Sequence, residues 1–177
     1  MIITDEAALR IICSDVAINE VDELRIKLDS ELKKSASNGS PGIGLAAPQI
    51  GIAKKFAIVR LDKGLNVDLV NAEIKSGYDK VIFNSEGCLS FPGRIEKTYR
   101  FKEVHIKNNL IEPYNFIATG LLAICIQHEL DHLNGILLPD IAIKENVKIK
   151  IRPNDPCPCG KRNSSGLKMK FKKCCGK

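Results

Sequence analysis

His128-Glu129-Leu130-Asp131-His132 is the stretch of sequence that decides how the rest of the chain is interpreted. Two histidines four residues apart on a helix lie on the same side, one turn apart, so one divalent metal ion can bind both imidazoles. Glu129 lies between them in the sequence, close enough to act on a water molecule at that metal. The chain holds only three histidines, and two of them stand in this pattern. The stretch therefore predicts a metal-dependent hydrolase site on a helix.

The surrounding residues predict the helix that carries this stretch. The mostly apolar segment 121–133 follows Thr119-Gly120 and is long enough for a buried helix, which Asn134-Gly135 would end. A second helix is expected over residues 19–36, where apolar residues recur on one helical face: Val21, Leu24, Leu28 and Leu32. Strands are expected over residues 56–61, 67–74, 104–107 and 114–118.

A catalytic metal site needs a third protein ligand and an open position for water. Cys88 is the best candidate, because Gly87 beside it in the segment 86–90 lets the backbone approach closely. A divalent ion bound by one thiolate and two neutral imidazoles keeps a net positive charge. That charge can acidify a bound water and polarise a carbonyl group.

The segment 42–49, Gly-Ile-Gly-Leu-Ala-Ala-Pro-Gln, has two interpretations. It matches the G-x-G-x-x-A pattern of dinucleotide-binding turns, but that pattern requires a strand before it and a helix after it. A loop rich in Ser, Asn and Gly precedes the segment, and Pro48 would interrupt a helix that starts there. We therefore favour a loop whose glycines let backbone groups meet a peptide-like ligand, with Gln49 as an amide donor.

Three segments in this order, 42–49, 86–90 and 127–132, resemble the three motifs of the peptide deformylases. The similarity continues through residues 119–126 and 133–135, and it covers roughly residues 5 to 140. The resemblance implies an α+β fold, with antiparallel sheets packed around a central metal-binding helix. It also implies an enzyme that removes the formyl group from the N-terminal formyl-methionine of nascent polypeptides.

The resemblance assigns the metal ligands and the base. Cys88, His128 and His132 would bind the catalytic metal, and Glu129 would assist the attack of a metal-bound water as general base and then acid. In this family the metal is often Fe²⁺ in the cell, and Zn²⁺, Ni²⁺ or Co²⁺ can replace it. The residues alone do not choose among these ions, because affinity follows ligand type and metal supply together.

The resemblance also assigns groups that contact the substrate. The oxyanion would be held by the metal, by Gln49 and by the backbone N–H of Leu89, while Ile43 and Gly44 would pair with the substrate backbone. Glu86 is expected among the substrate-binding residues. An ion pair with Arg100 is the alternative role for Glu86.

The remaining His and Cys residues of the first 143 residues have plain interpretations. His105 is expected to face solvent from a strand, and Cys13 is expected to be a small buried residue. Cys125 lies one helical turn before His128 and either lines the pocket or simply packs in the core.

Composition places the chain among soluble globular proteins of one compact domain with an appendage. It has 177 residues, 44% hydrophobic and 27% charged, and no apolar run approaches the roughly 20 residues of a membrane span. The N-terminus has no basic region or apolar run typical of a signal peptide, so the cytoplasm is the expected location. No membrane partner is expected.

The basic charge lies in the C-terminal segment. Residues 144–177 hold eleven Lys or Arg and two Asp or Glu, a charge of +9, and residues 1–143 hold sixteen and nineteen, a charge of −3. We expect a catalytic domain over residues 1–143, a basic linker over 144–152 and a small metal-binding motif over 153–177. After residues 138–140 the linker and the small motif stand in place of the long C-terminal helix of many deformylases. We therefore do not expect ribosome docking by that helix.

Four cysteines crowd into the last segment: Cys157, Cys159, Cys174 and Cys175. Four thiolates suit a closed tetrahedral zinc site, and this segment has too few large apolar residues to fold without such a staple. It resembles the SEC-C zinc module of the bacterial translocation ATPase, with a longer spacing between Cys159 and Cys174. A structural Zn²⁺ is therefore expected, and the basic tail is a candidate docking element for the ribosome, for rRNA or for a chaperone. The alternative is that the Lys and Arg residues of the tail form a solvated surface without a specific binding partner.

Two rival functions stay open from the sequence. A metallopeptidase also uses His-Glu-x-x-His, but its third ligand is a histidine or a glutamate rather than a cysteine. A translation-associated binding protein with a vestigial metal site is the non-enzymatic rival, although every candidate catalytic residue is present.

Overall fold

The computed structural model describes residues 1–61, 64–144, 153, 154, 163, 165, 167 and 169–174. The chain divides into two compact units, Met1–Ile143 and Lys144–Lys177. In the described part of the chain, no helix is long and apolar enough to cross a membrane. The expected linker, residues 144–152, lies outside the described residues apart from Lys144.

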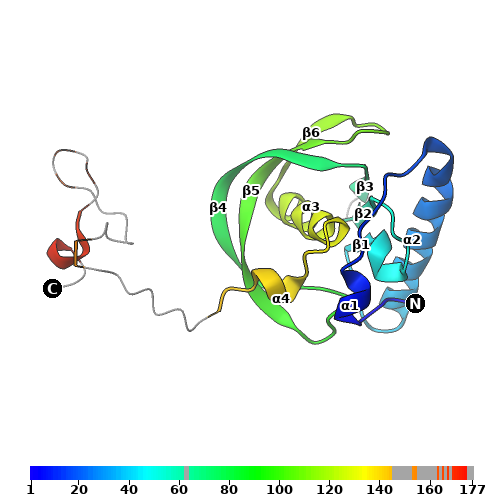
Figure 1. Cartoon of the computed structure of the whole chain (residues 1–177), viewed down its shortest axis with the longest axis horizontal. Helices are drawn as coiled ribbons and strands as arrows, with labels where there is room; N and C mark the ends of the chain where they lie inside the picture. The colour runs from blue at the N-terminus through cyan, green and yellow to red at the C-terminus, as the bar shows by residue number, and fades with distance from the viewer. Residues whose placement is uncertain are drawn as a thin grey trace. The chain divides into compact units, whose positions relative to one another are not determined.

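The first unit combines two three-stranded antiparallel sheets with helices (Figure 1). Its helical elements are α1 (Glu6–Leu9), the 3₁₀ turn η1 (Ile18–Glu20), α2 (Val21–Ser37), the 3₁₀ turn η2 (Ala47–Ile50), α3 (Gly120–Leu133) and α4 (Leu138–Ile141). One sheet holds β1 (Gly44–Ala46), β2 (Phe56–Arg60) and β3 (Asn66–Val70), and the other holds β4 (Glu73–Gly87), β5 (Ile95–Lys107) and β6 (Asn115–Thr119). The second unit has one short 3₁₀ turn among its described residues, η4 (Phe171–Lys173).

Helix α3 lies between the two sheets, and α2 covers the outer face of the first sheet (Figure 1). The β2 run Phe56-Ala57-Ile58-Val59 is fully buried, because alternate residues face opposite layers. Ala57 and Val59 pack with α3, and Phe56 and Ile58 pack with α2. The expected α+β fold, with antiparallel sheets around a central helix, is therefore confirmed for this unit.

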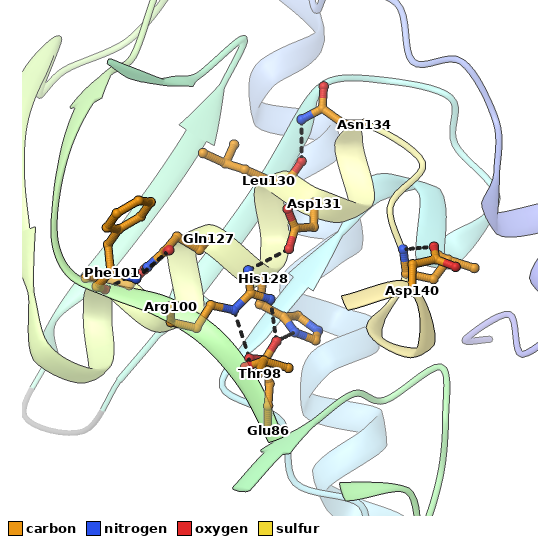
Figure 2. A network of polar contacts seen from close by, with 12 residues as sticks. Glu86, Thr98, Arg100, Phe101, Gln127, His128, Leu130, Asp131, Asn134 and Asp140 are labelled. Atoms are coloured by element: carbon orange, nitrogen blue, oxygen red, sulfur yellow. Dashed lines mark hydrogen bonds and ion pairs between the residues drawn. The ribbon is translucent and has the colours of Figure 1, made fainter. Parts of the chain in front are cut away.

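The amide of Gln127 fixes α3 to β5 in the manner of a neighbouring strand (Figure 2). Its Oε1 accepts from the backbone N–H of Phe101 and its Nε2 donates to the Phe101 carbonyl, both at 2.9 Å. These backbone groups need the side-chain amide because β6 pairs with β5 only from Glu103 to Lys107. Gln127 thereby fixes the position of His128 and His132 along the second sheet.

Both predicted helices are confirmed within two residues at their ends. In α2 the four apolar residues of the pattern are buried: Val21, Leu24, Leu28 and Leu32. Helix α3 ends at Leu133, Asn134 caps it, and Gly135 takes a left-handed φ of +68°.

The strand prediction was wrong over residues 67–74 and incomplete beyond them. Asn71 takes φ +50° and its side chain holds both backbone groups of Val16, so β3 ends at Val70 and β4 starts anew at Glu73. The remaining residues of β4 and residues 95–103 of β5 were missed, since their half-exposed residues give little apolar alternation.

Asn108 joins the two sheets from the end of β5. Its Oδ1 accepts from Val70 N at 2.8 Å and its Nδ2 donates to the Asp68 carbonyl at 3.0 Å, while the side chain is 1% exposed. An unpaired buried polar group costs about 1–3 kcal/mol. Moving β3 away from the second sheet would break both hydrogen bonds to Asn108 at that cost, so this side chain holds the strand in place.

Replacing Asn108 with Ala is expected to lower the free energy of unfolding by about 2 kcal/mol, because one buried and one half-buried backbone group of β3 lose their partner. Urea unfolding followed by circular dichroism measures this change. The matched control is Asn66→Ala at an exposed position of the same strand, which should change stability by less than about 0.5 kcal/mol. Equal effects of the two variants would contradict the sheet-joining role.

Candidate metal centre

Cys88, His128 and His132 bring their ligand atoms within 4.8 Å of one another. The two imidazoles come from successive turns of α3, with ring centroids 5.0 Å apart. Cys88 follows the last residue of β4, and its Sγ lies 3.2 Å from Nε2 of His132. The sequence-predicted ligands thus meet at one point, although 40 residues separate Cys88 from His128.

These residues fit a divalent metal ion. One sulfur and two imidazole nitrogens form a donor set typical of zinc, iron or cobalt, and three protein ligands leave a position for water. His128 donates from Nδ1 to Glu86 Oε1 at 2.7 Å, which leaves its Nε2 lone pair directed at the shared point. The second nitrogen of His132, Nδ1, is buried and has no hydrogen-bond partner among the described residues.

A buried ion-pair network contacts His128 at Nδ1, the nitrogen that does not face the other ligands (Figure 2). Glu86 Oε2 accepts from Thr98 Oγ1 and from Arg100 Nε, and Glu86 Oε1 accepts from Arg100 Nη2 as well as from His128. Arg100 also donates to Asp131 Oδ2 at 2.7 Å. Burial opposes ionisation of Glu86, but the hydrogen bonds from Arg100 and His128 outweigh it and lower its pKa to about 2.

This network favours an ion-pair role for Glu86 over the substrate contact expected from the sequence. Glu86 borders the cavity, but it is only 4% exposed and both of its carboxylate oxygens already accept hydrogen bonds. The alternative that the sequence left open, an ion pair with Arg100, is what the structure shows.

Glu129 stands beside the metal ligands with one free oxygen. Its side chain is 4% exposed, and its Oε2 is buried without a hydrogen-bond partner among the described residues. Burial raises the pKa of Glu129 to about 7. A carboxyl group with such a pKa can both accept and return a proton near neutral pH.

Gly44 is where Glu129 meets the first sheet. A Cβ atom built on Gly44 would lie 2.2 Å from Glu129 Oε1, closer than any side chain permits. Gly42 plays a similar part at the next turn, where a Cβ atom would meet the Leu89 side chain at 2.5 Å. The two glycines therefore allow β1, α3 and the Cys88 turn to come together.

The dinucleotide interpretation of segment 42–49 does not fit the structure. Gly44 to Ala46 form an antiparallel strand, and Ala47 to Ile50 form one 3₁₀ turn that Gly51 ends at φ +81°. Within the described residues 47–61 this 3₁₀ turn is the only helical element, so no α-helix N-terminus is there to hold a pyrophosphate group. Pro48 is instead the second residue of the short turn that places Gln49 at the candidate metal centre.

The Gln49 amide points its nitrogen at the metal ligands. Its Oε1 accepts from Ala46 N at 2.9 Å, and its Nε2 donates to Ser90 Oγ at 3.1 Å and faces Cys88 Sγ at 3.6 Å. The sequence prediction included Gln49 and missed Ser90, because a serine two residues after Cys88 carries no signal by itself.

A cavity of about 500 Å³ opens onto these groups. Ile43 and Gly44 border it. Apolar side chains form much of the rest: Phe83, Leu89, Phe91, Leu121 and Ile124. Cys125 is 7% exposed and also borders the cavity, so both of its interpretations hold, and burial raises its thiol pKa to about 12.

Two minor predictions are confirmed and the tail ligands stay untested. Cys13 is buried at 7% exposure, and His105 stands on β5 with a side chain 37% exposed. Cys157, Cys159 and Cys175 lie outside the described residues, and Cys174 follows the turn η4.

Comparison with known proteins agrees with this geometry. A family model described as polypeptide deformylase matches residues 1–148. Peptide deformylase 2 of Prochlorococcus marinus is 39% identical over 135 residues, which are 73% of this chain and 67% of that protein. Peptide deformylase 1 of Pseudomonas syringae pv. tomato is 44% identical over 105 residues, 57% of this chain and 62% of that protein. The chain thus spans under two thirds of this last relative.

Solved structures resemble the first unit. The actinonin complex of a peptide deformylase from Synechococcus elongatus gives a TM-score of 0.69 at 36% identity, over 82% of this chain and 79% of that chain. A Met-Ala-Ser-bound class I type b peptide deformylase from Acinetobacter baumannii gives a TM-score of 0.69 at 28% identity, over 80% of this chain and 96% of that chain. With a family model that covers most of its length, this chain belongs to the polypeptide deformylase family.

Proposed function

We propose that this protein removes the formyl group from the N-terminal formyl-methionine of nascent polypeptides. The observation that carries the proposal is the donor set of Cys88, His128 and His132 facing both Glu129 and the Gln49 amide. The Acinetobacter baumannii relative was crystallised with Met-Ala-Ser, a peptide with the sequence of such a product. Nascent chains are present in the cytoplasm, which is where we place the enzyme.

In the proposed reaction, the chain's own residues move the protons and hold the charge. Glu129 accepts a proton from the attacking water, which adds to the formyl carbon. Gln49 Nε2 and the Leu89 N–H donate to the oxygen that becomes negative, a stabilisation of about 3–4 kcal/mol for a well-placed donor. Glu129 then returns the proton to the amine nitrogen as the carbon–nitrogen bond breaks, which releases formate and a free N-terminus.

The catalytic metal would be held by Cys88, His128 and His132. When bound, it supplies Lewis-acid polarisation of the carbonyl group and acidifies water. We propose Fe²⁺ as the ion in the cell, with Zn²⁺, Ni²⁺ or Co²⁺ as possible replacements. Ile43 and Gly44 would pair with the substrate backbone from β1, at the open side of the cavity.

Glu129→Gln is expected to abolish formate release from formyl-Met-Ala-Ser while metal content stays unchanged, because the amide keeps the shape but cannot carry a proton. Formate release and metal content are measured on protein purified without oxygen. The matched control is Glu103→Gln on β5, whose carboxylate faces His105, and it should retain full activity. Substantial activity in Glu129→Gln would remove the role assigned to this residue.

The same assay separates the rival functions. Cleavage of an internal peptide bond, without formate release, would favour the metallopeptidase. Stoichiometric metal with neither activity would favour the translation-associated binding protein. The Cys88 thiolate and the Gln49 amide at the site favour deformylation over both.

Gly44→Ala tests the close approach of β1 to Glu129. The added methyl group would overlap Glu129 Oε1 and displace the carboxylate. Because a displacement of a catalytic group by about 1 Å can cost about 100-fold in rate, we expect kcat to fall by about that factor with metal content unchanged. Gly64→Ala is the control: its φ of +78° also strains an alanine, but no atom lies within 4 Å, so it should lower stability without changing kcat. Full activity in Gly44→Ala would mean that Glu129 has room to move.

For the second unit we propose a structural Zn²⁺ held by the four tail thiolates: Cys157, Cys159, Cys174 and Cys175. The charge of +9 over residues 144–177, against −3 over residues 1–143, supports a polyanionic partner such as rRNA on the ribosome. This segment would then replace the long C-terminal helix as the docking element.

The tail proposal predicts two metal ions per chain, falling to one in Cys157→Ser, because three thiolates hold zinc much less tightly. Cys13→Ser, a buried cysteine of the first unit, serves as control and should keep both ions. Ribosome co-sedimentation at low salt should fall when the chain ends at Ile143. Unchanged co-sedimentation would remove the docking role, and an unchanged metal count in Cys157→Ser would remove the zinc site.

A further inference from the structure

Ser90 is a buried hydroxyl next to the proposed oxyanion site, and no step of the proposed reaction uses it. Its side chain is 1% exposed, and its Oγ accepts from Gln49 Nε2 at 3.1 Å. It belongs to the turn after Cys88, which the Phe91 N–H closes onto the Cys88 carbonyl at 3.0 Å. Ser90 and Cys88 therefore approach the same amide from one short segment.

The orientation of the Gln49 carboxamide decides whether it can stabilise a negative oxygen. Only the NH₂ end can donate, so a rotation of 180° about the terminal bond would present a carbonyl oxygen and repel the charge. The backbone N–H of Ala46 holds Oε1 at 2.9 Å. A backbone N–H can only donate, so it pairs with the oxygen of the amide and not with the NH₂ group. This contact therefore excludes the orientation rotated by 180°.

Ser90 acts on the other end of the amide. The NH₂ group has two hydrogens, and its two neighbours are Ser90 Oγ and Cys88 Sγ. With one hydrogen held by Ser90, the other is directed to the side of the metal ligands. Two contacts thus set the amide plane, one from the Ala46 N–H to Oε1 and one from Nε2 to Ser90 Oγ, and the Gln49 side chain is 1% exposed with little freedom to leave them.

We propose that Ser90 is a positioning residue for the oxyanion donor: its hydroxyl accepts one Nε2 hydrogen of Gln49 and so directs the other at the reacting carbonyl oxygen. This inference rests on the proposed deformylation. It assigns Ser90 no contact with substrate or metal, and its effect should act only through Gln49.

Kinetics of Ser90→Ala, Gln49→Leu and the double variant test this coupling. Loss of a whole oxyanion donor costs on the order of 100-fold in kcat, so a misdirected one should cost about tenfold, with KM changed less than about twofold. In the Gln49→Leu background Ser90→Ala should cost nothing further. Ser90→Thr keeps the hydroxyl and should restore most of the rate, and Ser76→Ala, on β4, is the serine control.

A second readout does not depend on activity. In ¹⁵N-labelled, zinc-loaded protein, the side-chain NH₂ signals of Gln49 are identified by their loss in Gln49→Leu. They should be slow to exchange in the parent chain, and shifted and faster to exchange in Ser90→Ala. Metal content and the thermal midpoint are measured in parallel, so that a folding defect is separated from a change at the amide.

The outcomes are distinct. Unchanged kcat and unchanged amide signals in Ser90→Ala would overturn the positioning role, and so would an equal loss of rate in the Gln49→Leu background. If the parent chain releases no formate, the proposed function fails. The amide signals alone then decide whether Ser90 orients Gln49.

Discussion

The buried contact between Arg100 and Glu86 is the constraint on which the rest of the site depends. Arg100, 5% exposed, stands on the inner face of β5 and binds the end of β4 through Glu86 and helix α3 through Asp131. Removing one partner of a buried ion pair costs about 3–5 kcal/mol, so the three elements are held in one register. Glu86 also holds His128 and lies two residues before Cys88. The register between β4 and β5 therefore determines where the candidate metal ligands lie relative to one another.

Two buried carboxylates near α3 behave in opposite ways for a physical reason. Glu86 receives hydrogen bonds from Arg100, Thr98 and His128, which lower its pKa to about 2. Glu129 is equally buried, but its Oε2 has no partner among the described residues and burial raises its pKa to about 7. The first is therefore a fixed negative charge that orients an imidazole, and the second is free to exchange a proton with a ligand in the cavity.

The sequence reveals what depends on local spacing and hides what depends on partners far along the chain. The i,i+4 histidines, Glu129 and the helix around them follow from a helical period, and Cys88 from the need for a third ligand. The Arg100 contacts and the Ser90 contact join residues 14 to 41 positions apart, for which a single sequence gives no pairing rule. Most of the long strands β4 and β5 was missed for a related reason: their stability comes from pairing with each other, and half-exposed residues leave no clear alternation.

The glycines at 42 and 44 show how a misleading pattern arises from a real constraint. Both a dinucleotide turn and this site need a backbone without side chains, because something must come close. Here the close neighbours are protein groups: the Leu89 side chain against Gly42, and Glu129 against Gly44. The same strand residues then lead directly into Gln49, whose amide is held by Ala46 and Ser90. One short segment thus gives room to the proposed base, Glu129, and supplies the proposed oxyanion donor, Gln49. A change in its backbone path would therefore disturb proton transfer and charge stabilisation together, even with all three metal ligands intact.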